Sequence, residues 1–120
     1  SMSVKQPIAG LVLSNTIRPG IIGLAKTIAD EVGKDNITIN NIAPGHIDTE
    51  RQEELAKNWG SKSGKTVKEM YEQFKNNSVV GRVGTPEDIG SIVTFLSSPK
   101  SSFITGTTIS VDRGRIRGLL

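Results

Sequence analysis

The sequence predicts an α/β fold in which helices alternate with strands of a parallel sheet. Apolar residues spaced by three or four indicate helices, and two short runs rich in β-branched residues, 37–42 and 107–112, indicate strands. Strands separated by helices usually pair in parallel through right-handed crossovers. A parallel sheet needs cover on both faces, and an unpaired hydrophobic edge invites association. The chain is therefore expected to be a piece of a larger α/β unit or to associate with other copies of itself.

The first helix is predicted after a loop that covers residues 1–13. Gly33 would end it, and its buried stripe would consist of Ile17, Ile21, Leu24 and Ile28. Pro19 leaves the start open, because proline suits a first helical turn and moves the preceding residue away from helical angles. The helix therefore begins either near Ser14 or at Pro19.

A long polar stretch, residues 46–78, follows the first strand and is expected to hold two short helices separated by a flexible break at 60–64. The second of these would bury Val67, Met70, Tyr71 and Phe74. Thr85 and Pro86 predict the start of the last helix, because Thr caps a helix and Pro fits its first position. Pro99 would end this helix, and its buried stripe would be Ile89, Ile92, Val93 and Leu96.

Composition narrows the possible functions. The net charge is +3, but basic and acidic residues are interspersed, which indicates an ordinary solvated surface and not a nucleic-acid-binding face. No apolar run has the length of a membrane span, and no signal peptide is visible. Cysteine is absent, so neither disulfides nor a thiolate metal site is expected, and a cytoplasmic location fits. The expectation is a protein without metal, membrane or nucleic-acid partners.

Four segments, in this order, resemble the short-chain dehydrogenase/reductase family. They are a strand that runs into a Pro-Gly turn with Thr four residues after Gly (36–49), the entry into the last helix (81–89), and the segments at 95–98 and 104–112. Each pattern alone is common, but together they cover nearly the whole chain. The similarity is greatest to the 3-oxoacyl-acyl-carrier-protein reductase branch.

The resemblance implies a fold and a domain organisation. Residues 1–120 would be the carboxy-terminal part of a single Rossmann-like domain, a doubly wound parallel sheet to which this chain gives two strands, two main helices and a helical substrate lid at 50–78. The family's Gly-rich phosphate-binding turn does not occur in this sequence. The nucleotide-binding amino-terminal half is therefore expected to be absent from this chain.

The resemblance also places the catalytic positions. In this family a Tyr exchanges a proton with the substrate oxygen, a Lys one turn later lowers the pKa of that Tyr, and a Ser orients the carbonyl. Aligning residues 20–24 on the family helix puts Ser14 at the Tyr position and Arg18 at the Lys position. Ser1, thirteen residues before Ser14, stands at the Ser position, with Ser3 as the second choice.

Two interpretations of Ser14 and Arg18 remain open. As a variant pair four residues apart, Arg18 would hold ribose hydroxyls or an anionic substrate, although serine is a poor acid and arginine keeps its proton. Alternatively Ser14 caps the helix, which is the favoured interpretation, and Arg18 is a surface charge. A helix that begins at Pro19 would separate the two faces and remove the pair.

The resemblance assigns contacts with the cofactor, NADP or NAD, to the turn after the first strand. The cofactor-binding residues would be Pro44, Gly45, Ile47 and Thr49, where parallel strands end at their carboxyl edge. His46, the only histidine, is expected to face solvent. Arg82 would tie the end of the lid to the body. Four lid residues either line a substrate pocket or, as is more common, pack the lid itself: Trp59, Met70, Tyr71 and Phe74.

The function implied for the full-length parent is an NAD(P)-dependent oxidoreductase that moves hydride between the nicotinamide nucleotide and a small carbonyl or alcohol substrate. The chain alone is expected to be inactive, and the parent to be a homo-oligomer. The alternative is a catalytically degenerate member of the family that binds nucleotide or serves as a scaffold. A third possibility is a short protein that dimerises by itself.

Overall fold

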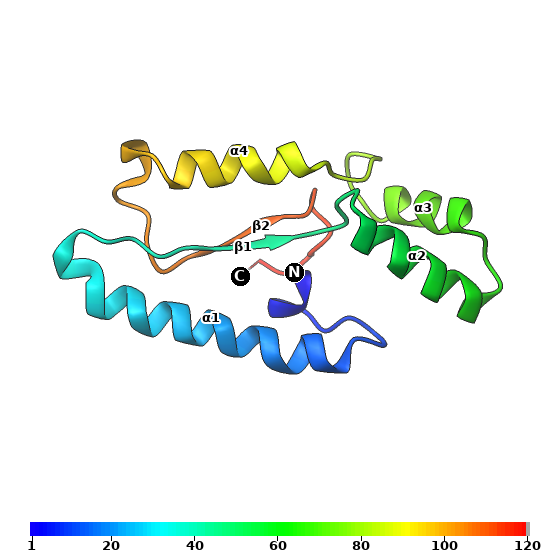
Figure 1. Ribbon diagram of the computed structural model, residues 1–120, viewed down its shortest axis with the longest axis horizontal. Helices are drawn as coiled ribbons and strands as arrows, with labels where there is room; N and C mark the ends of the chain where they lie inside the picture. Colours follow the sequence, from blue (N-terminus) through cyan, green and yellow to red (C-terminus); the bar gives the residue numbers. More distant parts are fainter. Residues whose placement is uncertain (120) are drawn as a thin grey trace.

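The computed structural model describes residues 1–119 and places two parallel strands between helices (Figure 1). The elements are α1 (Val12–Val32), β1 (Asn41–Pro44), α2 (Glu50–Ser63), α3 (Val67–Asn76), α4 (Pro86–Leu96) and β2 (Thr108–Val111), with 3-10 turns η1 (Met2–Val4), η2 (Gly33–Asp35) and η3 (Pro99–Ser101). Helices α1 and α4 lie on opposite sides of the strand pair, and α2 and α3 lie beyond one end. Within residues 1–119, no helix combines the length and apolar character needed to cross a bilayer.

The two strands pair in parallel, as predicted, with Asn41 opposite Thr108. The first strand was expected at 37–42 but begins at Asn41. In the stretch before β1, side chains take part in hydrogen bonds that a strand ladder would make between backbone groups. The Ile39 N–H donates to Thr105 Oγ1 at 3.1 Å, and the Asn40 amide donates to the Ile104 carbonyl at 2.8 Å. The extended chain before β1 is therefore held to the loop before β2 largely by side-chain hydrogen bonds, and the ladder starts later.

Helix α1 begins at Val12, so the alternative start at Pro19 is wrong. The interpretation of Ser14 as the cap is also wrong, because the cap residue is Leu11 and forms no side-chain hydrogen bond. Asn15 secures this end instead: its amide accepts from the Ile8 N–H and donates to the Ile8 carbonyl, both at 2.9 Å. Pro19 lies inside the helix, where it removes a single backbone donor.

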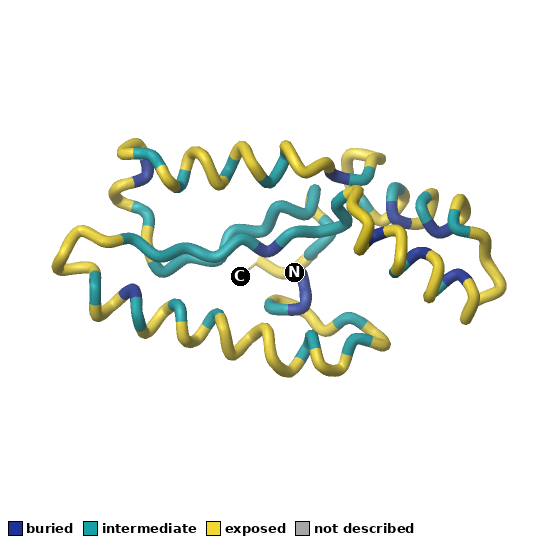
Figure 2. The backbone as a smooth tube through the Cα atoms, viewed as in Figure 1, coloured by how far each residue is buried: buried dark blue, intermediate teal, exposed yellow. Residues whose placement is uncertain are grey.

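The outward face of α1 is apolar, contrary to the predicted buried stripe. Ile17, Ile21 and Leu24 are 59%, 54% and 56% exposed, whereas Ala29 is buried. On α4, Val93 of the predicted stripe is also exposed, and its other three members are only half-buried. Figure 2 shows exposed residues along the outer sides of both helices. Helix periodicity marks apolar faces, but two strands are too narrow to cover more than one side of α1.

The lid at 50–78 contains the two predicted helices, but the break between them is shorter than expected. Helix α2 continues through Gly60 to Ser63, and the chain turns at Gly64, whose φ of 68° is left-handed. Gly60 is buried, and a Cβ at this position would lie 2.5 Å from the Lys65 carbonyl oxygen. The predicted apolar face of α3 is confirmed: Met70 and Phe74 are buried with Ala56 of α2, and Val67 and Tyr71 pack against them.

The turn after β1 is held tightly against the segment after β2. The Gly45 N–H donates to the Val111 carbonyl at 3.0 Å, which continues the strand pairing past Pro44. A Cβ on Gly45 would lie 2.8 Å from Asp112 Cα, so only glycine fits this approach without movement. Farther along, Ile47 forms a parallel bridge with Gly84. The turn is therefore fixed to the body at two points.

Replacing Gly45 with alanine is expected to destabilise the full-length protein by about 1–3 kcal/mol, because the new methyl group meets backbone that cannot move freely. The matched control is Gly33→Ala: no heavy atom lies within 4 Å of a Cβ there, and its φ of −58° suits alanine. Urea unfolding measures both, and the control should stay within about 0.5 kcal/mol. Equal unfolding free energies for both variants would contradict the close approach.

Candidate active site

A cavity of about 380 Å³ lies at the carboxyl end of β1, and six of the seven predicted site residues line it. They are Ser1, Arg18, Pro44, Gly45, Ile47 and Thr49. The lid adds Leu55 and Trp59 from α2. Residues distant in the sequence are thus brought to the edge where parallel strands end, which is where α/β folds bind ligands.

The seventh residue, Ser14, joins this group through a chain of hydroxyls. Ser14 Oγ lies 2.9 Å from Ser3 Oγ, and Ser3 Oγ lies 3.0 Å from Ser1 Oγ. Ser3 is buried, and Ser1 lines the cavity. The chain of hydroxyls therefore leads from the first turn of α1 to the cavity wall. Both candidates for the family's Ser position therefore belong to one connected set of proton donors and acceptors.

Arg18 lies on α1 one turn after Ser14 and reaches the same cavity. The two residues share a helix face, because the helix already contains both of them. Among residues 1–119, Arg18 forms no salt bridge, so its charge is not neutralised by a neighbouring carboxylate. A guanidinium stays protonated, so it offers the cavity a fixed positive charge and hydrogen-bond donors.

Thr49 begins α2 and has a structural duty of its own. Its Oγ1 accepts from the Gln52 N–H at 3.3 Å and donates to the Ile47 carbonyl at 3.3 Å, which caps the helix and closes the turn. The first backbone N–H groups of α2 therefore lie at the cavity, where the positive end of the helix dipole favours an anionic group.

His46 does not face solvent, and that expectation is wrong. Its ring stacks on Phe74 with centroids 4.2 Å apart, and its Nδ1 lies 3.0 Å from Gln52 Nε2. Burial, together with the charge of Arg115, lowers the pKa of His46 to about 4, so the ring is neutral at pH 7. No local pattern could show this, since Phe74 lies 28 positions later in the sequence.

Asp88 in the first turn of α4 joins the end of the lid to the end of β2. Its carboxylate accepts from Arg82 at 2.8 and 2.9 Å, and from Arg113 at 3.0 Å, which confirms Arg82 as a tie between lid and body. The Thr85 N–H also donates to it at 2.8 Å. The hydrogen bond from the Thr85 N–H has the largest effect in lowering the pKa of Asp88, and the hydrogen bond from Arg82 has the second largest. Arg113 itself adopts a left-handed φ of 55°.

The lid side chains divide between the two roles considered for them. Met70 and Phe74 form the lid core, and Trp59 packs on that core while also lining the cavity. The Tyr71 hydroxyl donates to Asp48 Oδ1 at 3.1 Å, outside the cavity lining. Residues 1–119 contain no group of three or more His, Cys, Asp or Glu side chains placed to hold a metal ion.

Comparison with known proteins agrees with this geometry. Residues 1–115 match the family described as enoyl-(acyl carrier protein) reductase. The short-chain reductase protein NovJ of Streptomyces niveus is 38% identical over 89% of this chain and 39% of its own length. The 3-oxoacyl-[acyl-carrier-protein] reductase FabG of Chlamydia muridarum is 43% identical over 81% of this chain and 35% of its own length.

The same similarity holds in three dimensions. The crystal structure of L-sorbose reductase from Gluconobacter frateurii, complexed with NADPH and L-sorbose, superposes with a TM-score of 0.88 and 28% identity over 99% of this chain and 46% of that one. The chain belongs to the short-chain dehydrogenase/reductase family, and it spans less than half the length of these relatives.

The half-buried, neutral His46 should make stability depend on pH. Its folded pKa of about 4 lies below its ordinary value of 6.5, so the unfolded chain binds more protons between these values. Stability is therefore full above pH 6.5 and falls as the pH drops toward 4, by on the order of 2–3 kcal/mol. Thermal unfolding of the full-length protein at pH 7.5 and pH 5 measures this loss.

His46→Phe is the matched variant, because it keeps the stack on Phe74 and removes the titrating ring. It should lose less stability than the parent between pH 7.5 and pH 5. An identical loss in both proteins would show that other groups cause the pH dependence.

Proposed function

We propose that the full-length protein is an NAD(P)-dependent oxidoreductase that reduces a small carbonyl compound or oxidises the corresponding alcohol. The observation that carries the proposal is the convergence of six predicted residues on one cavity, with Ser14 linked to it by hydroxyls. The L-sorbose reductase structure, a complex with NADPH and L-sorbose, supports this class of cofactor and substrate. NADP and NAD are both consistent with these residues.

The turn after β1 would hold the nicotinamide end of the cofactor. Pro44 and Gly45 bring backbone to the cavity wall, Ile47 offers an apolar contact, and Thr49 places the start of α2 where a phosphate or carboxamide can accept hydrogen bonds. The bound nicotinamide supplies or accepts the hydride. The close approach of Gly45 to Asp112 keeps this wall rigid.

The proton would pass through Ser14. On reduction, the carbonyl carbon gains the hydride, and the carbonyl oxygen takes a proton from Ser1 Oγ, the member of the hydroxyl chain that lines the cavity, as its bond to carbon becomes single. Ser3 then passes a proton to Ser1, and Ser14 passes one to Ser3 and regains its own from solvent. Arg18 stabilises the negative charge on oxygen during the transfer, which a serine hydroxyl needs because its alkoxide forms far less readily than a phenolate.

A second candidate is a family member that binds nucleotide without turning substrate over. The specific observation in its favour is that, within residues 1–119, Ser14 Oγ contacts only another hydroxyl, Ser3 Oγ, and no base. The two candidates share the cofactor site and differ in chemistry alone. A cytoplasmic location also stays a prediction.

Oxidation of NADPH and NADH by the full-length protein, against ketones, aldehydes and acyl thioesters, tests the proposal. Ser14→Ala and Arg18→Met should each lower kcat by about 10²–10⁴-fold, as the loss of a proton donor or of transition-state charge stabilisation does. Thr16→Ala is the control, because the Thr16 hydroxyl bonds only to the Val12 carbonyl on the same helix, at 2.9 Å.

Unchanged turnover in both variants would refute the roles given to Ser14 and Arg18. Nucleotide binding without turnover of any substrate in the panel would favour the second candidate.

Self-association of the full-length protein is the remaining proposal, because the apolar outer face of α1 needs a cover. Sedimentation velocity should show an oligomer, and Ile21→Glu in the centre of that face should shift the profile toward monomer. Glu31→Gln, on the same helix but polar, should leave it unchanged. A monomer at all concentrations would contradict the proposal.

A further inference from the structure

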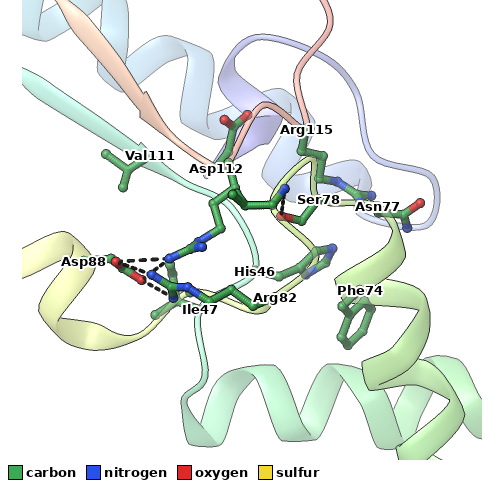
Figure 3. A pocket seen from close by; sticks show the side chains of 13 residues that line it. His46, Ile47, Phe74, Asn77, Ser78, Arg82, Asp88, Val111, Asp112 and Arg115 are labelled. Carbon is green, nitrogen blue, oxygen red and sulfur yellow. Dashed lines mark hydrogen bonds and ion pairs between the residues drawn. The ribbon is translucent and has the colours of Figure 1, made fainter.

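A second cavity, of about 200 Å³, lies between α3, the first turn of α4 and the segment that follows β2 (Figure 3). It shares only His46 and Ile47 with the cavity described above. An engineered protein cavity of about 150 Å³ admits benzene, so this one has room for a small organic molecule. The family positions discussed above give it no role.

The cavity contains a half-buried arginine, one donor atom of which is buried without a hydrogen-bond partner in the described residues. Arg82 and Arg113 are both held by Asp88, whereas Arg115 forms no salt bridge within residues 1–119. Arg115 Nη1 is buried and makes no hydrogen bond there. Partial burial lowers the pKa of Arg115, and the nearby charge of Asp112 opposes this shift. A buried donor of a charged group is costly unless an acceptor satisfies it.

His46 presents a second buried donor to the same space. Its Nδ1 lies 3.0 Å from Gln52 Nε2 and 3.3 Å from Gln52 Oε1, and the ring is assigned the tautomer in which Nδ1 accepts from the amide N–H at the shorter distance. The neutral ring then carries its proton on Nε2, which is buried and has no hydrogen-bond partner among residues 1–119. Figure 3 shows the ring between Phe74 and Arg115.

The rest of the lining sets the kind of acceptor. Three arginines and two aspartates face the cavity, so it has one excess positive charge when His46 is neutral. Apolar side chains complete the wall: Ile47, Phe74, Val80 and Val111. One charge, two donors and an apolar wall fit a group with a single negative charge, two acceptor atoms and a short hydrocarbon part.

We propose that this cavity binds a small aliphatic carboxylate. One carboxylate oxygen accepts from Arg115 Nη1, the other accepts from His46 Nε2, and the hydrocarbon part packs against the apolar wall. A phosphate fits less well, because it carries up to two charges and has no apolar part. The site lies beside the turn that follows β1 and shares His46 and Ile47 with the cavity of the proposed reaction.

Isothermal titration calorimetry of the full-length protein at pH 7 and constant ionic strength tests the site. The probes are sodium butyrate, its neutral analogue butyramide, and inorganic phosphate. Butyrate should bind saturably at one site per chain, and more tightly than either other probe. Arg115→Met should weaken butyrate binding at least tenfold, because it removes the charge and keeps the length of the side chain.

Two further variants make the test decisive. His46→Phe should weaken butyrate binding several-fold while the stack on Phe74 keeps the lid in place, so it also serves if Arg115→Met fails to fold by circular dichroism. Arg117→Met is the matched control: Arg117 is exposed, does not line the cavity, and should bind butyrate like the parent. No saturable butyrate binding, equal affinity in the Arg115 and Arg117 variants, or tighter binding of phosphate or butyramide would each overturn the proposal.

Discussion

The close approach of the turn after β1 to the end of β2 is the constraint on which the rest of the structure depends. Gly45 lies so near Asp112 that a side chain at this position would meet backbone. Both cavities share the residues that follow, His46 and Ile47, so a shift of this turn would alter both at once. The Ile47 bridge to Gly84 extends the same constraint to the start of α4.

The lid is attached to this fixed turn by side chains of opposite character. On one side, His46 stacks on Phe74 in the lid core, where the contact is apolar and the imidazole is neutral. On the other side, Asp88 gathers Arg82 and Arg113 in a charged cluster that remains partly exposed. The stack gains from burial, whereas the cluster gains little from its exposed charges and mainly fixes geometry.

The apolar surface that the chain leaves exposed follows from its small sheet. Two strands offer one narrow face to each main helix, so the outer side of α1 remains uncovered, and residues such as Ile17 and Leu24 stay accessible. The buried apolar residues among those described are few, and half of them are small: Ala29, Ala43 and Ala56. Burial of this extent stabilises a fold weakly, which is the physical reason to expect further protein against these faces.

Local chemistry in the sequence was enough to predict the α/β class, the parallel pairing, the lid helices and the start of α4 at Thr85, because each depends on periodicity, turn residues or capping within a few positions. The family resemblance added the cofactor role of the turn at Pro44 and Gly45, and six of the seven predicted site residues line one cavity in the structure. Their chemical roles remain predictions.

What only the tertiary structure decided involves partners far apart in the chain. The first strand begins later than predicted because the side chains of Thr105 and Asn40 form hydrogen bonds between the stretch before β1 and the loop at 104–107. Residues of the predicted stripe of α1 are exposed, because periodicity marks an apolar face but does not show whether another element covers it. His46 stacks on Phe74 of the lid and lies near Arg115 at the end of the chain. That environment, and not its position in a turn, determines its partial burial and its lowered pKa. Sequence patterns report the preferences of neighbours along the chain, whereas these outcomes depended on which distant surfaces the fold brought together.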